Sequence, residues 1–179
     1  MSTHPRQLSA VLAAFILLLV SCAEREPTGV EHVADLQPIL NAAADRLPVS
    51  QSSSGLAYPI GLCGANVVRI LFEGGGTATH AGRFWIENTV CLDQATGAAT
   101  DGMAVLTAAN SDEVHMTFSG QAVAPTELVL TYVIDGGTGR FAHATGELVV
   151  DVFLSADLTT FTSGGAGWVA YEASDRADR

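Results

Sequence analysis

Short alternating strands recur along this chain from residue 58 onward, and no segment between them is long enough to form a crossover helix. Because parallel strands need long crossovers, the pattern predicts an antiparallel meander that closes into a barrel or splits into a sandwich to hide its edges. Further strands are expected near 57–62, 76–81 or 158–163. The stretches with strand-like alternation or composition are 66–73, 82–93, 102–110, 113–120, 127–135, 146–154 and 167–173.

The N-terminal residues predict an export signal. A polar start with one arginine leads into the apolar run 10–20, which is too short for a bilayer span of about 20 residues. The following Leu-Val-Ser-Cys, ending at Cys22, resembles the bacterial lipobox, whose cysteine accepts a lipid through its nucleophilic thiolate. The alternative is an ordinary signal peptide followed by a chance cysteine.

The lipobox resemblance implies that residues 1–21 are removed and that Cys22 anchors the chain to the outside of a membrane through two or three acyl chains. Two or more chains hold a protein stably, whereas a single chain does so only marginally. Ala23 stands where inner-membrane members of this class usually have Asp. We therefore expect an extracytoplasmic protein, on the outer membrane if the cell has one.

The charge of the mature chain bears on its partners. Without residues 1–21 the chain keeps 158 of its 179 residues and 7 of its 8 basic side chains, against 19 acidic ones, a net charge of −12. Binding to nucleic acid needs clustered Lys and Arg, so we expect no nucleic-acid partner. The length suits one domain with its own core, and the charge favours solubility.

The segment before the strands differs in composition. Residues 22–55 are expected to be a tether, with a possible amphipathic helix over 36–47 and a linker in PVSQSSSG. Pro38 is compatible with that helix only near its first turn. The predicted barrel domain then spans 56–174, and 175–179 form a polar tail.

Two cysteines remain after Cys22, and an oxidising compartment favours a disulfide between them. If Ile70 lies opposite Phe84 in the first hairpin, the same register puts Cys63 opposite Cys91. Directly opposed positions are close enough for a disulfide. Two free thiols are the alternative.

A glycine motif in residues 137–142 fits G-x-G-x-x-A, the phosphate-binding turn of dinucleotide-binding proteins. That turn requires a helix after the glycines. Here Gly146 and an alternating β-branched run follow, and no strand–helix–strand unit occurs in the chain. We therefore expect no nucleotide and no other cofactor.

Two glycine-rich phrases instead resemble a known family. GGTGRFAHATGELVV and GTATHAGRFWIENTVCLD are similar to segments of bacterial exported proteins with allene oxide cyclase-like barrels, a family that includes the plant dirigent proteins. With the polar hairpin TAANSDEVHMTFSG, the resemblance covers about residues 58 to 173. It implies an all-β, antiparallel, eight-stranded, calycin-like barrel of a family that often forms homo-oligomers.

We expect these phrases to form barrel corners, because glycine permits positive φ and tight bends. Arg140 is expected over the barrel mouth or paired with an acid such as Asp135, and Phe141 is expected to plug the core end. The residues assigned to the corners are Gly82, Arg83, Phe84, Gly137, Gly139, Arg140, Phe141 and Gly146.

Candidate catalytic and metal-binding residues are few. His80, His115 and His143 lack the spacing of a metal site, so they are interpreted as surface or corner residues and no metal is predicted. Asp151 is the one acid in a strongly apolar strand, and it becomes an acid–base candidate if it faces the lumen rather than the exterior. No catalytic residue set is recognisable.

Two functions remain open. The favoured one is a binding module that holds a small apolar molecule or a protein partner; the alternative is a cyclase-like or dirigent-like enzyme acting on a small apolar substrate in the lumen. An eight-stranded barrel has room for packed side chains or one small ligand. Bulky aliphatic residues such as Leu130 and Val150 predict a filled lumen, which would favour a structural or interaction role.

Overall fold

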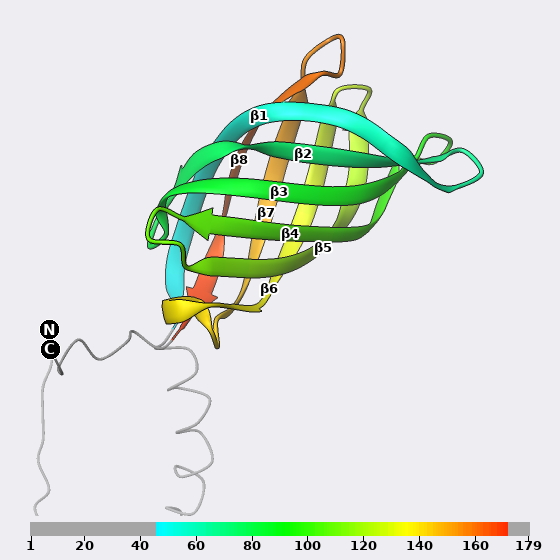
Figure 1. Ribbon diagram of the computed structural model, residues 1–179. Coiled ribbons are helices and arrows are strands. Elements are labelled where there is room, and N and C mark those ends of the chain that lie inside the picture. The colour runs from blue at the N-terminus through cyan, green and yellow to red at the C-terminus, as the bar shows by residue number, and fades with distance from the viewer. Residues whose placement is uncertain (1–45, 172–179) are drawn as a thin grey trace, which may run out of the picture. The chain divides into compact units, whose positions relative to one another are not determined.

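Residues 46–171 are described by a computed structural model, and they form a closed antiparallel barrel in which consecutive strands pair and β8 pairs with β1 (Figure 1). The predicted all-β, eight-stranded antiparallel barrel is thus confirmed. A short 3-10 helix, η1 (Gly139–Phe141), lies between β6 and β7. The strands are β1 (Leu47–Gly64), β2 (Val67–Ala78), β3 (Gly82–Asp93), β4 (Ala98–Ala108), β5 (Glu113–Ala124), β6 (Glu127–Gly137), β7 (Thr145–Leu154) and β8 (Thr160–Ala170).

The core fills the inside of the barrel, because alternate residues of each strand point to opposite faces. In β6, Leu128, Leu130, Tyr132 and Ile134 are buried, and the residues between them face outward. Burying an apolar side chain of this size stabilises a fold by about 1.5–3 kcal/mol. Within residues 46–171, no helix is both long and apolar enough to cross a membrane.

β1 corrects the prediction of a linker. The strand begins at Leu47 and runs through the serine-rich stretch, pairing with both β2 and β8. Val49 is buried, whereas Ser50 and Ser52 are exposed on the other face. Small polar residues are typical of linkers, but here neighbouring strands on both sides supply their backbone partners. The predicted leader, tether, most of the helix over 36–47 and the tail lie outside the described residues.

The register of the β2–β3 hairpin also differs from the prediction. Ile70 lies opposite Val90, not Phe84, because β2 continues through Gly74–Gly76 and turns only after Ala78. The glycine run lies just beyond the predicted strand 66–73. It belongs to the strand because β1 approaches closely there: a Cβ on Gly74 would collide with the Ser54 carbonyl oxygen and lie 2.8 Å from the Gly55 Cα.

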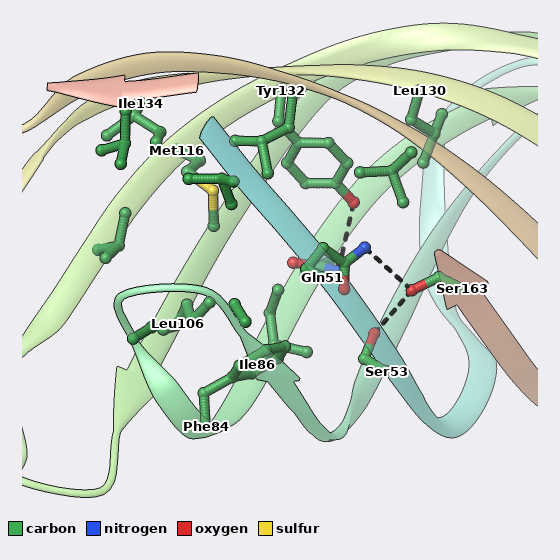
Figure 2. A pocket seen from close by; sticks show the side chains of 18 of the residues that line it. Gln51, Ser53, Phe84, Ile86, Leu106, Met116, Leu130, Tyr132, Ile134 and Ser163 are labelled. Atoms are coloured by element: carbon green, nitrogen blue, oxygen red, sulfur yellow. Dashed lines mark hydrogen bonds between the residues drawn. The ribbon is translucent and has the colours of Figure 1, made fainter. Parts of the chain in front are cut away.

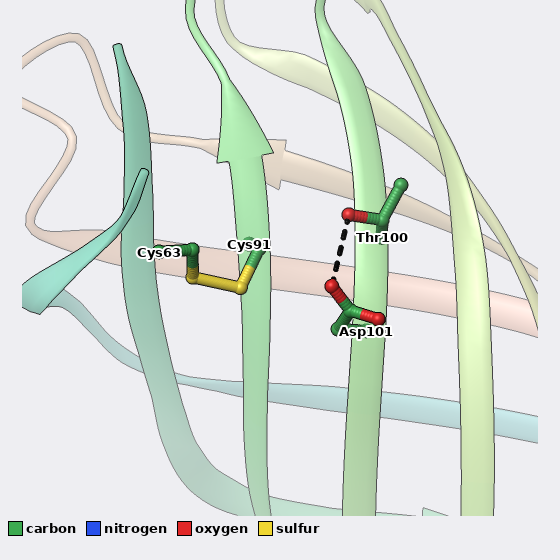
Figure 3. Close-up of a disulfide and its surroundings, with 4 residues drawn as sticks. All are labelled: Cys63, Cys91, Thr100 and Asp101. Atoms are coloured by element: carbon green, nitrogen blue, oxygen red, sulfur yellow. Dashed lines mark hydrogen bonds between the residues drawn. A yellow bond between two sulfur atoms is a disulfide. The ribbon is translucent and has the colours of Figure 1, made fainter. Parts of the chain in front are cut away.

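A disulfide joins Cys63 and Cys91, so the predicted pair is confirmed although the register used to predict it was wrong (Figure 3). Cys91 lies opposite Arg69 in the ladder. Cys63 falls in an irregular part of β1, between the paired residues Leu62 and Gly64, and its Cα lies 6.0 Å from that of Cys91. The bond therefore ties the end of β1 to β3 across the β1–β2 hairpin. A disulfide that closes a loop of this length stabilises the fold by about 3–4 kcal/mol, because it lowers the conformational entropy of the unfolded chain.

The contact between β1 and β2 at Gly74 predicts a position-specific effect of adding one methyl group. We expect Gly74→Ala to lower the free energy of unfolding by about 1–3 kcal/mol or more, because the new Cβ meets backbone that cannot move aside. Gly75→Ala is the matched control, since its Cβ would lie 3.6 Å from the Phe84 carbonyl oxygen, an ordinary contact. Chemical denaturation checks both. Equal losses in the two variants would contradict the close approach.

Candidate functional site

The barrel encloses a cavity of about 80 Å³, lined by side chains from all eight strands and from η1 (Figure 2). Most of the lining is apolar, and it includes Ile86, Leu106, Met116, Ile134 and Val150. The packed core fills the remaining lumen, so the prediction of a filled lumen is correct except for this cavity. The core side chains therefore leave part of the interior empty.

One end of the cavity is formed by η1 and the β2–β3 turn. Phe141 is 2% exposed and lines the cavity, as expected for a residue that plugs the core end. Gly139 has a φ of +54°, which favours glycine, and it directs the chain into η1. The glycine-rich phrase thus forms a corner that positions Phe141.

Arg140 secures this corner through a partner that differs from the one expected. Its Nε lies 3.6 Å from the Asp112 carboxylate, and its guanidinium donates to the Ala81 carbonyl oxygen at 3.5 Å. Asp135 instead accepts a hydrogen bond from the Thr117 hydroxyl at 2.9 Å. Arg140 thereby connects η1 to the β4–β5 and β2–β3 turns. These turns meet at one barrel end because consecutive antiparallel strands alternate in direction.

Asn88 is a buried polar side chain in the lumen, with 6% of its surface exposed. Its Nδ2 donates to the Tyr132 hydroxyl at 3.4 Å, and its Oδ1 has no hydrogen-bond partner among the described residues. An unpaired buried polar atom costs about 1–3 kcal/mol. Asn88 also lines the cavity, so its free oxygen is a group that a bound molecule could satisfy.

Tyr132 holds the hydroxyl that Asn88 contacts. Its ring stacks on Phe118 with the centroids 4.3 Å apart, which fixes the orientation of the phenol. Burial raises the pKa of Tyr132 well above its ordinary value, because the phenolate would be desolvated. The phenol is therefore neutral at physiological pH and keeps its O–H as a donor.

A second polar group faces the same lumen from β1 and β8. The Ser53 and Ser163 hydroxyls lie 2.7 Å apart, and the Gln51 Nε2 donates to Ser163 at 3.4 Å. Figure 2 shows these three side chains converging from their strands. Ser53 and Ser163 satisfy each other, which distinguishes them from Asn88.

The cavity is electrically neutral. Its described lining contains no Asp, Glu, His, Lys or Arg. Its polar groups are amides and hydroxyls, and Tyr132 stays protonated. A few placed polar groups in an apolar cavity are typical of sites that bind small molecules. The arrangement can hold a neutral molecule and orient it by hydrogen bonds, but it offers no charged acid or base for proton transfer.

Asp151 does not belong to this site. It is exposed, while its neighbours Val150 and Val152 are buried and line the cavity. The strand period of two therefore places the carboxylate outside the barrel, and the acid–base role left open for a lumenal Asp151 is wrong.

The three histidines lie apart from the cavity lining. His115 is exposed and its Nε2 lies 2.9 Å from the Glu113 carboxylate. His80 occupies the β2–β3 turn, with Nε2 3.2 Å from the Pro48 carbonyl oxygen, and His143 is exposed after η1. Between residues 46 and 171, no three His, Cys, Asp or Glu side chains gather to hold a metal ion.

Sequence reasoning missed the polar residues of the site, although the signal for one was present. Phe84, Ile86 and Val90 alternate with mostly polar residues in the sequence, and the same alternation points Asn88 inward. Gln51 and Ser53 give no such signal, because the composition of their stretch predicts a linker. An amide among alternating apolar residues is the feature that marks the site.

Because the Asn88 oxygen is unpaired, we expect this site to lower the free energy of unfolding. We expect Asn88→Leu combined with Tyr132→Phe to match or exceed the wild type in free energy of unfolding, by up to about 2 kcal/mol, because replacing both polar partners by apolar groups removes the desolvation cost. The single Asn88→Leu variant leaves the Tyr132 hydroxyl without its partner, and should be about 1 kcal/mol less stable than the double variant. Thermal and chemical denaturation check this order. A double variant less stable than the single would contradict it.

Comparison with known proteins assigns no family to this chain. No family model, no curated protein and no solved structure matches it. The function is therefore inferred from the geometry of the cavity.

Proposed function

We propose that this protein is an exported, lipid-anchored barrel that binds one small, neutral, largely apolar molecule in its lumen. The observation that carries the proposal is the cavity of about 80 Å³, apolar along most of its lining and equipped with buried amide and hydroxyl groups. Apolar surface supplies affinity, and a few fixed polar groups supply orientation.

The size of the cavity limits the ligand. Pockets for drug-sized molecules measure roughly 300–1,000 Å³, and an engineered apolar cavity of about 150 Å³ accepts benzene or xenon. A cavity of about 80 Å³ suits a smaller molecule, such as a short aliphatic chain. Because side chains from every strand line it, the space follows the interior of the barrel, which favours a slender ligand.

The neutral lining favours binding over catalysis. A cyclase-like or dirigent-like enzyme would have to steer its substrate by shape alone, since the described lining contains no charged group to move a proton. The resemblance to allene oxide cyclase-like barrels supports the lumen as the place for a small apolar molecule. It does not require that the molecule be converted.

The membrane link in this proposal rests on the sequence. The lipobox-like residues that end at Cys22, after an apolar run too short to span a bilayer, support export and lipid attachment. The net charge of −11 for the whole chain disfavours direct binding to anionic lipid, so the acyl chains would supply the attachment.

Binding in the lumen is tested with propane as a neutral probe. We expect saturable NMR shifts in the methyl groups of Leu106 and Met116, which line the cavity, but not in that of the exposed Val133. Val150→Phe should weaken binding at least about tenfold, because the added ring takes up the available space.

The matched control is Val149→Phe on the neighbouring position of β7. Val149 is 47% exposed on the outer face, whereas Val150 is 5% exposed and lines the cavity. Both variants must first show a cooperative thermal transition. If neither propane nor ethanol gives saturable shifts with the wild type, or if both variants bind propane equally well, the cavity is not the binding site and the proposal is wrong.

The anchor is tested by detergent partitioning of cells that express the full chain. We expect the wild type in the detergent phase and Cys22→Ala in the aqueous phase, because the alanine variant cannot accept the lipid. Mass analysis of the wild-type N-terminal peptide should show the acylated cysteine. Equal partitioning of the two proteins would contradict the anchor while leaving the lumenal site untouched.

A further inference from the structure

Asn88 is a polar side chain at a position where packing of the barrel does not require a polar residue. It stands in an alternating apolar row of β3, and its Oδ1 is buried without a partner while its Nδ2 contacts Tyr132. Buried polar groups in folded proteins are almost always paired, so an exception at a cavity wall indicates a partner that the chain itself does not supply. The Ser53–Ser163 pair beside it shows no such deficit.

The unpaired atoms define the chemistry of that partner. Asn88 presents an acceptor, and the Tyr132 hydroxyl, whose oxygen accepts from Asn88, has its O–H free to donate within the described part of the chain. A hydroxyl group donates and accepts at once, so a single ligand oxygen can pair with both residues. It also matches the Asn88 amide in either orientation of its oxygen and nitrogen.

An ionised ligand does not fit this environment. Burying a charge without a countercharge is far more costly than burying a hydroxyl, and no described lining residue carries one. A purely apolar ligand would leave the Asn88 oxygen unpaired in the complex as well. A neutral molecule with one hydroxyl satisfies the polar atoms and covers the apolar wall.

The strand order gives the orientation of such a molecule. Along β3, Phe84 and Ile86 separate Asn88 from the turn at Gly82, and along β6 Ile134 lies on the η1 side of Tyr132. The polar pair is thus deeper in the lumen than the apolar residues near η1. A ligand hydroxyl at Asn88 leaves the alkyl chain directed toward the η1 end.

We propose that the lumenal ligand is a small neutral alcohol whose hydroxyl group donates to Asn88 Oδ1 and accepts from the Tyr132 O–H, with its alkyl chain toward Phe141. The inference rests on the proposed function, since it names the chemical class of the molecule that the cavity binds. Asn88 and Tyr132 are then the residues that make the cavity distinguish an alcohol from an alkane of the same shape.

Two probes of nearly equal shape test this inference: ethanol and propane, which differ by a hydroxyl in place of a methyl group. The quantity measured is the ratio of their dissociation constants, obtained by NMR titration of each protein. We expect Asn88→Leu to move this ratio at least about tenfold toward propane, because the hydroxyl then meets an apolar wall. The double variant Asn88→Leu, Tyr132→Phe should move it at least as far.

Thr131→Val is the control, since it removes a hydroxyl from an exposed position next to Tyr132 and should leave the ratio unchanged. If Asn88→Leu alone does not fold, the ratio measured with the double variant tests the inference, because the double variant has no unpaired polar group at this position. An unchanged ratio in the Asn88 variants, with propane still bound, overturns the inference and leaves the proposed function standing. Absence of saturable binding by both probes in the wild type overturns the two together.

Discussion

Closure of the sheet between β1 and β8 is the constraint on which the rest of the structure depends. The two strands pair from Leu47 opposite Val169 to Leu56 opposite Thr160, which removes both edges of the sheet. Small residues also let β8 lie close to its other neighbour, β7, where a Cβ on Gly167 would collide with the Glu147 carbonyl oxygen. Without this closure the lumen would be an open face, and Asn88 would be exposed to water.

The closed barrel also explains how a destabilising polar site is tolerated. An apolar core and a continuous backbone ladder hold the fold, and the Cys63–Cys91 bond restrains the long β1–β2 hairpin. The cost of an unpaired oxygen at Asn88 is small compared with the total stabilisation from these interactions. If the proposed ligand pairs with this oxygen, its binding would offset that cost, and stability and ligand affinity would be linked at the same atom.

The sequence predicts the fold better than the site. Apolar alternation identifies most strands, and it predicts that Phe84, Ile86 and Leu130 face one core. It cannot predict the register at Gly74, because a run of glycines is also typical of a loop. Only the position of the neighbouring strand shows that these glycines allow two strands to approach closely. The sequence also hides Ser53, since alternating small polar residues carry no hydrophobic period. The side of the sheet that Asp151 occupies follows only once the barrel is closed.

The central claim is that Asn88 and Tyr132 hold the hydroxyl group of a small lumenal ligand. A crystal structure of the full-length protein purified from its own host tests this claim most directly. We expect electron density for a small non-protein molecule in the cavity, with an oxygen within hydrogen-bond distance of Asn88 Oδ1 and of the Tyr132 hydroxyl. A lumen that contains only packed side chains, or a molecule that leaves Asn88 unpaired, would contradict it.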